Sequence, residues 1–545
     1  MSYTSVFKEL GMNPVLAVLK DEIKALYLED DAPWIIGYSG GKDSTAVLQL
    51  TWLAVSELKP EERTKPVHVI STDTLVENPV VSLWVDHSLE VMGKSAKKSG
   101  LPIYPHKLTP SIEDSFWVNL IGKGYPTPRH KFRWCTERLK IKPSNQFISD
   151  MVDTNGEAIL FLGTRKAEST RRAATMTKHE KGRVRDRLSP NAGLPGTLVY
   201  TPIEDWTNDD VWMFLVQVKN PWGYSNKELL GMYAGATEDG ECPLVVDTST
   251  PSCGDSRFGC WVCTLVEKDK SMTAMIQNDD EKEWMLPLLE LRNLIDFRHD
   301  GERKNKVTGQ KEPCYDKRDA FNGVLGGQLK TILELRSKKK MEEIVRDPMW
   351  ERHIRDYRRL NTGKVQMMAN GRYIPGPYIQ MTREAWLRAL LQAQAHMREN
   401  GPPEVGKLQL ITLPELQEIR RIWVVDKHEL EDTLPAIYEE CTGEEYPGSR
   451  LDDQSVMGQE EMEILKELCD DDQLHYELVR DLLGIEQEQM HRVRRRGLFK
   501  DLEKSFQKHF YEDQDEAVAV ATEYAEARAK AQEGIAPKSL TKAKS

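Results

Sequence analysis

A glycine-rich loop that contains a lysine follows a short apolar run near the N-terminus. The apolar run is PWII, and the loop reads GYSGGKDST, from Gly37 to Thr45. The common phosphate-binding loop of kinases and ATPases has the form G-x-x-x-x-G-K-[ST]. Here three residues separate Gly37 from Gly41, and Asp43 follows Lys42. The loop therefore departs from that template twice, although it still places small residues and a cation between an expected strand and an expected helix.

The residue types in this loop suit an anion. Gly40 and Gly41 let the backbone approach a ligand closely, and the helix expected to follow offers free N–H groups and a positive dipole end. Lys42 adds a mobile positive charge, and Ser39 and Ser44 can donate hydroxyl hydrogen bonds. The loop therefore predicts a nucleotide phosphate site. The alternative is a glycine turn that carries an exposed lysine.

Cysteines form the second group with the potential for chemistry. The segment SCGDSRFGCWVCT contains Cys253, Cys260 and Cys263, with Cys242 a little upstream and Cys135 far earlier in the chain. Eight cysteines in a long chain without an export signal favour reduced thiols or metal ligation over disulfides. Four thiolates can hold either a [4Fe-4S] cluster or a zinc ion. Spacing alone leaves both choices open.

Composition limits the partners. The 545-residue chain has a net charge of -12, so contact with a polyanion must come from local patches. Residues 165–187 form such a patch, with nine Lys/Arg against three acids, a net of +6, and residues 491–500 form a second basic cluster. No apolar run approaches the roughly 18 residues of a membrane span, and MSYTSVFKEL is not a signal peptide. We expect a cytoplasmic protein without membrane contact.

Short β-rich runs alternate with helical stretches in the first half of the chain. This alternation predicts an α/β fold with a doubly wound, mainly parallel sheet, in which ligands bind at the carboxyl ends of the strands. Thr207 and Asp210 have capping-box spacing before one of the helices. The expected division is an N-terminal helical segment (1–29), a nucleotide-binding domain with the cysteines (30–270), a mainly helical C-terminal region (271–536) and a disordered tail (537–545).

Several segments resemble one superfamily. SGGKDS after a strand resembles the PP-loop of the ATP pyrophosphatases, which cleave ATP between the α- and β-phosphates and adenylate a substrate oxygen. LGTRKAESTRR and TPIEDWTNDDVW resemble segments of the PAPS reductase-like branch, over roughly residues 30–270. The resemblance implies a PP-loop (adenine nucleotide α-hydrolase-like) fold and an ATP site with Mg²⁺. It implies that ATP is bound by Ser39, Gly40, Gly41, Lys42, Asp43, Ser44, Asp73, Gly163 and Arg165.

Two cysteine-containing segments of the chain also resemble this branch. FGCWVCT and WCTERLKIKP are similar to motifs of cluster-bearing sulfonucleotide reductases, although only one cysteine stands in the second segment. The resemblance favours a [4Fe-4S] cluster over zinc. Its implied ligands are Cys135, Cys253, Cys260 and Cys263. Cys242 is either a spare ligand or a persulfide acceptor, and the implied catalytic residues are Lys42, Asp43, Arg165 and Cys242.

The chain differs from the assimilatory reductases of this branch. They are shorter and end in ECG-[LI]-H, whereas this chain ends APKSLTKAKS. Its length, cysteines, basic insert and the segment GRYIPGPYIQMTREAWLRALLQ resemble the DNA phosphorothioation sulfurtransferases of the DndC family. That resemblance implies DNA as substrate, a cysteine desulfurase as sulfur donor and other proteins of the modification complex as partners. The alternatives are a PAPS/APS reductase and a scaffold with a vestigial nucleotide loop.

Overall fold

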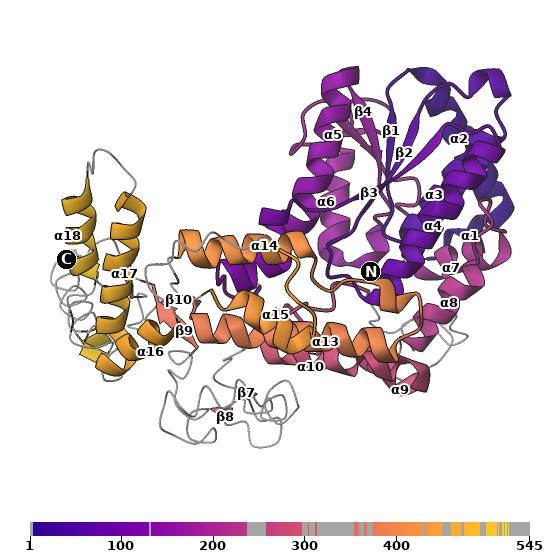
Figure 1. Cartoon of the computed structure of the whole chain (residues 1–545). Coiled ribbons are helices and arrows are strands. Elements are labelled where there is room, and N and C mark those ends of the chain that lie inside the picture. Colours follow the sequence, from indigo (N-terminus) through magenta and orange to yellow (C-terminus); the bar gives the residue numbers. More distant parts are fainter. Residues whose placement is uncertain are drawn as a thin grey trace, which may run out of the picture. The chain divides into compact units, whose positions relative to one another are not determined.

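The structure is a computed structural model, and its described residues fall into two compact units (Figure 1). The first unit contains Met1–Phe116, Pro128–Asp296 and Ala393–Leu410, and the second contains Trp117–Thr127, Phe297–Gln392 and Ile411–Ser545. Within these limits the structure describes residues 4–129, 132–236, 258–266, 268–296, 303–304, 311–312, 354–358, 365–367, 374–427, 429, 432–448, 459–469, 473–490, 497–508, 511, 515–516, 518–519 and 522.

A six-stranded sheet forms the centre of the first unit. Its strands are β1 (Trp34–Gly37), β2 (Val67–Thr72), β3 (Ile103–Leu108), β4 (Ala158–Phe161), β5 (Ser189–Pro190) and β6 (Thr197–Tyr200). Their order is β3-β2-β1-β4-β6-β5, and every pair is parallel except β5 with β6. The predicted α/β fold with a mainly parallel sheet is confirmed. The two-residue edge strand β5 is an addition that no sequence pattern indicated.

Helices cover both faces of this sheet, with α2, α3 and α4 on one side and α5 on the other (Figure 1). The helices of the unit are α1 (Val6–Leu10), α2 (Met12–Glu29), α3 (Lys42–Ser56), α4 (Pro79–Lys98), α5 (Lys142–Asn155), α6 (Thr170–Glu180), α7 (Asn208–Gln217), α8 (Asn226–Gly235), α9 (Lys270–Asn278) and α10 (Leu286–Ile295). Because β1 pairs in parallel with β2 and with β4, the carboxyl ends of these three strands lie at the same edge of the sheet.

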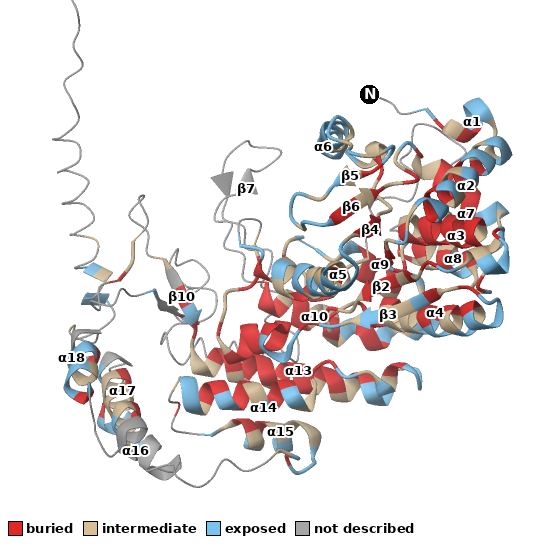
Figure 2. Ribbon diagram, turned by 90° about the horizontal axis from the view of Figure 1, so that it is seen from above, coloured by how far each residue is buried: buried red, intermediate tan, exposed pale blue. Residues whose placement is uncertain are grey.

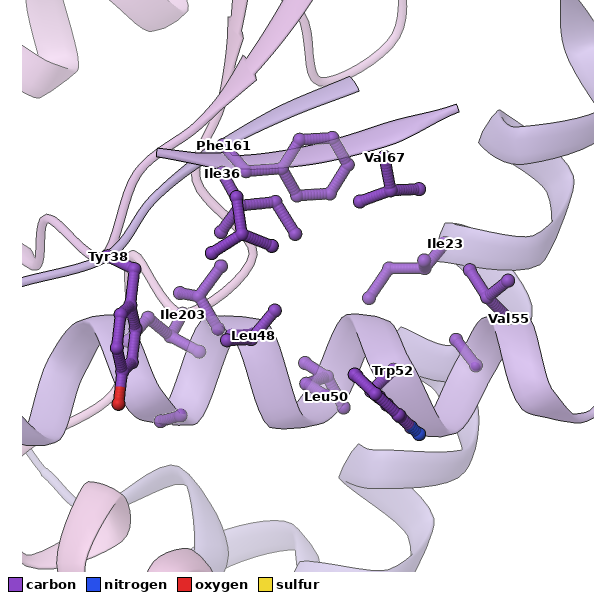
Figure 3. Packing of buried hydrophobic residues seen from close by; sticks show 14 of the residues in the cluster. Ile23, Ile36, Tyr38, Leu48, Leu50, Trp52, Val55, Val67, Phe161 and Ile203 are labelled. Atoms are coloured by element: carbon purple, nitrogen blue, oxygen red, sulfur yellow. The ribbon is translucent and has the colours of Figure 1, made fainter. Parts of the chain in front are cut away.

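Alternating side chains of β1 explain why both faces are covered. Trp34 and Ile36 belong to the larger core, which also contains α3, whereas Ile35 packs with Ile148 of α5 on the opposite face. Successive residues of a strand point to opposite faces, so a continuous apolar run needs cover on both sides. Figure 3 shows Ile36 and Phe161 facing Leu48 of α3 in the larger core. The sheet and α3 thereby fix the position of the loop between them.

Asp210 caps two helices. Its carboxylate accepts from the Thr207 N–H and hydroxyl, as the predicted capping box requires, so this prediction is confirmed. The same carboxylate accepts from the Ser5 hydroxyl at 2.5 Å and from the backbone N–H groups of Val6 and Phe7. A single buried acid thus satisfies the first turns of α7 and α1 and fastens the N-terminal helix to the sheet domain.

The second unit is mainly helical and includes a segment from the first half of the chain. That segment contains a π-helical turn, Val118–Gly122, whose Ile121 carbonyl accepts from the buried Trp423 indole at 3.0 Å. The other elements lying in this unit are β7 (Arg303–Lys304), β8 (Lys311–Glu312), β9 (Arg355–Tyr357), β10 (Pro375–Tyr378), the first part of α13 (Gln380–Asn400), α14 (Leu413–Arg421), α15 (Leu434–Thr442), α16 (Gln459–Leu468), α17 (Gln473–Met490) and α18 (Leu498–Lys508). The predicted helical C-terminal region is confirmed.

Among the described helices, none has the length and apolar character needed to cross a bilayer.

Candidate nucleotide and cysteine site

The glycine-rich loop lies at the carboxyl end of β1 and leads into α3, which begins at Lys42. Gly40 has φ +73, and a Cβ at this position would lie 2.5 Å from a methyl group of Val85. Only glycine fits such a backbone without strain. Gly41 is the N-cap of α3 and provides no side-chain cap. The start of α3 therefore leaves backbone N–H groups for an anion, as the phosphate-site prediction requires.

Two serines brace the loop from inside. The Ser44 hydroxyl donates to the Gly41 carbonyl at 3.0 Å and accepts from the Ser39 N–H at 3.2 Å, and the two hydroxyls lie 3.2 Å apart. These bonds close the turn on itself before any ligand binds. A preformed turn reduces the entropy that ligand binding must overcome.

Asp43 and Arg165 connect the loop to the end of β4. The Arg165 Nε donates to a carboxylate oxygen of Asp43 at 2.7 Å, and a second guanidinium nitrogen donates to the Trp206 carbonyl at 3.3 Å. A Cβ on Gly163 would lie 2.9 Å from the Asp43 carbonyl oxygen, so this position must remain free of a side chain. The structure thus brings Asp43 next to Gly163 and Arg165, although 122 positions separate Asp43 from Arg165 in the chain.

Lys42 contacts a residue that the sequence patterns did not identify. Its ammonium lies 5.2 Å from the centre of the Tyr233 ring and 3.6 Å from the Asp43 carboxylate. The Lys42 backbone N–H also donates to the Tyr233 hydroxyl, at 3.4 Å. Tyr233 lies in α8, between the segments that carry the resemblance, and only the fold shows that it adjoins the loop.

Asp73 follows β2 at the same edge of the sheet. Its carboxylate accepts from the Leu75 N–H at 2.8 Å and pairs with Lys107 at 2.9 Å. Lys107 also pairs with Asp86. Asp73 thus lies at a strand end, as expected, and its carboxylate contacts Leu75 and Lys107.

Cys260 lies beside the end of the second strand. It forms a β-bridge with Glu77, and its sulfur lies 3.3 Å from the Thr74 hydroxyl oxygen. Lys140 pairs with Glu77 at 3.2 Å. Desolvation raises the pKa of Cys260 to about 12, with the charge of Glu77 as a further cause. Such a thiol stays protonated at neutral pH unless a metal or another cationic group displaces the proton.

Cys135 and Cys263 belong to the same neighbourhood. Burial raises the pKa of Cys135, and the nearby Cys263 raises it further; Cys263 also contributes to the raised pKa of Cys260. Within the described residues, no three His, Cys, Asp or Glu side chains are arranged so that they could already hold a metal ion. Cys242 and Cys253 lie outside the described residues. Cys135 and Cys260 thus each interact with Cys263, and the four-cysteine ligand set stays a prediction.

A buried arginine supports the cysteine segment. Arg292 of α10 donates from two guanidinium nitrogens to the Cys263 carbonyl, at 3.1 and 2.9 Å, and from one of them to the Val266 carbonyl. It also pairs with the buried Asp296 one helical turn later. Sequence patterns gave no sign of this role, because the sequence does not distinguish a buried arginine of an apolar helix from one on its solvent-exposed face.

The basic stretch 165–187 is largely paired with carboxylates. Arg165 pairs with Asp43, Lys166 with Asp205, Arg172 with Glu168, Arg183 with Glu204, Arg185 with Asp30 and Glu157, and Arg187 with Glu22. Most of the expected positive charge thus fastens the insert to its own domain. Three exposed cations, Arg171, Lys178 and Lys181, have no ion pair in the described part of the chain, and they lie on or just after α6, which is mostly exposed (Figure 2).

Two family profiles match the chain. Residues 33–223 match the phosphoadenosine phosphosulfate reductase domain, a range that contains all six strands of the sheet and the glycine-rich loop. Residues 460–507 match a small protein found in certain Dnd DNA modification systems. The second match covers α17 and most of α16 and α18.

Relatives are distant. A stretch of 200 residues is 26% identical to an uncharacterized protein of Methanocaldococcus jannaschii and covers 37% of this chain and 35% of that relative. The phosphate complex of a PAPS reductase from Candida auris is 13% identical, with a TM-score of 0.24, over 42% of this chain and 93% of that one. The U34-tRNA thiolase NcsA from Methanococcus maripaludis, with its [4Fe-4S] cluster, is also 13% identical, with a TM-score of 0.25, over 56% and 88% of the two chains.

Proposed function

We propose that the chain is an ATP-dependent sulfurtransferase of DNA phosphorothioation, an enzyme of the DndC type. It activates a non-bridging oxygen of a DNA phosphate with ATP and exchanges that oxygen for sulfur. The observation that carries the proposal is the combination, in one unit, of a glycine-rich loop at the uncapped start of α3 and the interacting cysteines Cys135, Cys260 and Cys263. The match of residues 460–507 to a small protein of Dnd systems supports DNA as the substrate.

The nucleotide half of the reaction rests on the loop. The start of α3 and Lys42 would bind the departing pyrophosphate, and Asp43 with Arg165 would hold the loop in position. Attack of a DNA phosphate oxygen on the α-phosphorus of ATP forms a DNA-phosphoryl-AMP mixed anhydride and releases pyrophosphate. The DNA phosphate oxygen is a poor leaving group by itself. Once it is adenylated, it can depart as part of AMP. Mg²⁺ would accompany the ATP phosphates, and Asp73 at the strand edge, which pairs with Lys107 in this structure, would orient it.

Sulfur then replaces AMP. Sulfide adds to the activated phosphorus, the P–O bond to AMP breaks, and the products are a DNA phosphorothioate and AMP. This substitution is redox-neutral because sulfide carries both electrons of the new P–S bond. Sulfur delivered as a persulfide by a cysteine desulfurase must first gain two electrons, from a thiol reductant or a cluster.

The gathered cysteines suit a thiophilic metal group. Cys135, Cys260 and Cys263 are desolvated or mutually interacting thiols, and Lys140 lies beside them to offset negative charge. With Cys253 as the fourth ligand, they would hold a [4Fe-4S] cluster. Bound there, it would relay electrons one at a time from an external thiol reductant, which supplies the two electrons that persulfide sulfur needs to reach the level of sulfide. Cys242 is the candidate persulfide carrier.

DNA would contact the first unit through α6. Arg171 and Lys178 are two helical turns apart on one face, and Lys181 follows the helix. Phosphate contacts by such cations release counterions and make affinity depend on salt. The helices matched by the Dnd-system profile would bind other proteins of the modification complex. The reaction would take place in the cytoplasm.

The test replaces Arg171, Lys178 and Lys181 together by alanine. If all three contact phosphates, the slope of log K against log salt should flatten by up to about 2.7 units, and phosphorothioate in cellular DNA should fall. Replacement of Lys97 and Lys98, two exposed cations at the end of α4, is the matched control. A triple variant with unchanged DNA affinity and full modification would remove α6 from the DNA site.

A sulfonucleotide reductase is the second candidate, because residues 33–223 match the PAPS reductase domain. A reductase would convert PAPS or APS to sulfite with a thiol as reductant, and it would not need DNA. Incubation of the purified protein with each nucleotide and a thiol decides between the two. Sulfite formation would favour the reductase, whereas its absence together with DNA-dependent AMP release would favour the sulfurtransferase.

A further inference from the structure

We infer that Tyr233 is a positioning residue that couples the nucleotide loop to the cysteine segment. The inference rests on the proposed ATP site, and it concerns a residue outside the range matched by the reductase domain. Tyr233 is buried in α8 and contacts both candidate halves of the site. The Tyr233 ring therefore connects Lys42 of the loop to Phe258 of the cysteine segment.

The first contact is with the loop. The Tyr233 hydroxyl accepts from the Lys42 N–H at 3.4 Å, and the Lys42 ammonium lies 5.2 Å from the centre of the ring. A Cβ on Gly41 would approach the same hydroxyl to 3.1 Å, so the absence of a side chain at Gly41 also makes room for Tyr233. The ring thus holds the backbone and the side chain of the lysine that would meet the phosphates.

The second contact is with the cysteine segment. The Phe258 ring packs edge-on against Tyr233, with 4.7 Å between ring centres, and Phe258 stands two residues before Cys260. A third ring, that of the fully buried Trp212, supports Tyr233 at 5.2 Å. Such edge-to-face contacts have preferred geometries, so movement of one ring constrains its neighbour. A change at Lys42 therefore reaches the segment that carries Cys260 and Cys263.

ATP supplies the reason for a change at Lys42. A phosphate bound at the start of α3 competes with the Tyr233 hydroxyl for the Lys42 N–H and attracts the Lys42 ammonium away from the ring. Tyr233 and then Phe258 adjust to the new position of the lysine. Occupancy of the nucleotide loop is thereby communicated to the cysteines, so that sulfur transfer can follow adenylation.

Hydrogen exchange of the full-length protein tests the coupling. A nonhydrolysable ATP analogue should slow exchange in residues 37–45 and change exchange in residues 258–266 of the wild type. In Tyr233→Leu the first effect should remain and the second should disappear. Tyr233→Phe keeps the ring and should restore the second effect. Tyr224→Phe, which removes a hydroxyl that donates to the Trp84 carbonyl, is the control.

Steady-state kinetics provide a second readout. Because bound phosphate draws the Lys42 ammonium away from the ring, Tyr233→Leu removes a contact of the nucleotide-free protein and should lower the KM for ATP by about 2- to 5-fold. Tyr233→Phe should stay closer to wild type. If Tyr233→Leu does not fold, Phe258→Leu replaces it and should lose the exchange effect at 258–266 alone. Protection of residues 37–45 with no response at 258–266 in the wild type would overturn the coupling. No response in either segment would instead overturn the ATP site itself.

Discussion

The guanidinium of Arg165 donates to the carboxylate of Asp43 at 2.7 Å, although 122 positions separate the two residues in the chain. Arg165 is almost fully buried, and Asp43 belongs to the first turn of α3. The pair joins the end of β4 to the loop after β1, which are neighbours only because the two strands pair in parallel. The position of the glycine-rich loop thus depends on a contact between two strand ends.

Asp43→Asn should loosen this contact without removing its oxygen acceptor. A hydrogen bond between charged groups is worth more than one with a neutral partner, so the free energy of unfolding should fall by about 1–2 kcal/mol. Urea unfolding measures the change. Asp21→Asn, at a largely exposed position of α2, is the control and should leave the free energy of unfolding close to that of wild type. Equal stability of Asp43→Asn and wild type would show that the pair does not brace the loop.

Lys42→Ala should impair ATP turnover more than folding. Loss of a charge-assisted contact to phosphate costs about 1.5–3 kcal/mol, which corresponds to roughly a tenfold loss or more in kcat/KM. Pyrophosphate release measures it. Lys59→Ala removes an exposed lysine of the same domain and should leave turnover unchanged. Normal turnover by Lys42→Ala would exclude the lysine from the phosphate site.

Arg292→Met should loosen the cysteine segment while it leaves the nucleotide loop intact. The substitution removes the hydrogen bonds to the Cys263 and Val266 carbonyls. We expect a lower metal content after anaerobic purification and faster maleimide labelling of Cys260 and Cys263. Cys441 of α15 serves as the internal control thiol, because its labelling should not change. Arg292→Lys should recover part of the effect. Unchanged metal content and labelling in Arg292→Met would contradict the role assigned to the arginine.

Two histidines on neighbouring strands should make stability depend on pH. The Nδ1 of His68 lies 3.0 Å from the Nε2 of His106, burial lowers the pKa of both rings, and His106 lowers that of His68 further. The folded protein therefore favours neutral rings, whereas the unfolded chain takes up protons at higher pH. Stability should be fully present above about pH 6.5 and decline as the pH falls below it.

Thermal unfolding between pH 7.5 and 5.5 tests this dependence. His106→Gln should flatten the curve because it removes one of the two rings, whereas His87→Gln, in α4, should leave the curve as it is in wild type. A His106→Gln protein with the wild-type slope would show that other groups cause the pH dependence.

Local patterns predicted the parts of the fold that depend on local rules. The parallel sheet follows from alternating strands and helices, and the α7 capping box follows from Thr207 and Asp210. The second role of Asp210, as the cap of α1, depends on a contact across more than 200 positions, which no local pattern contains. The assignment of residues 117–127 to the second unit was invisible for the same reason.

The candidate site divides in the same way. The spacing of glycines and lysine identified the loop, and the spacing of Cys253, Cys260 and Cys263 indicated a candidate metal-binding segment. Tyr233 and Arg292 were missed because an aromatic or a cation inside a helix has many uses, and only tertiary packing shows which one applies. For the basic stretch 165–187, the sequence pattern indicated more than the fold provides. Its composition indicated a large free charge, whereas the fold pairs Arg183, Arg185 and Arg187 with acids from other segments.

Oxygen labelling of the DNA phosphate shows whether ATP adenylates a phosphate oxygen of DNA before sulfur replaces it. A DNA substrate with ¹⁸O in the non-bridging phosphate oxygens would be incubated with the protein, its partner proteins, ATP and a sulfur donor, and the AMP would be analysed by mass spectrometry. We expect ¹⁸O in the phosphate of AMP, in amounts equal to the phosphorothioate formed. Release of unlabelled AMP, or of ADP, alongside phosphorothioate formation would contradict it.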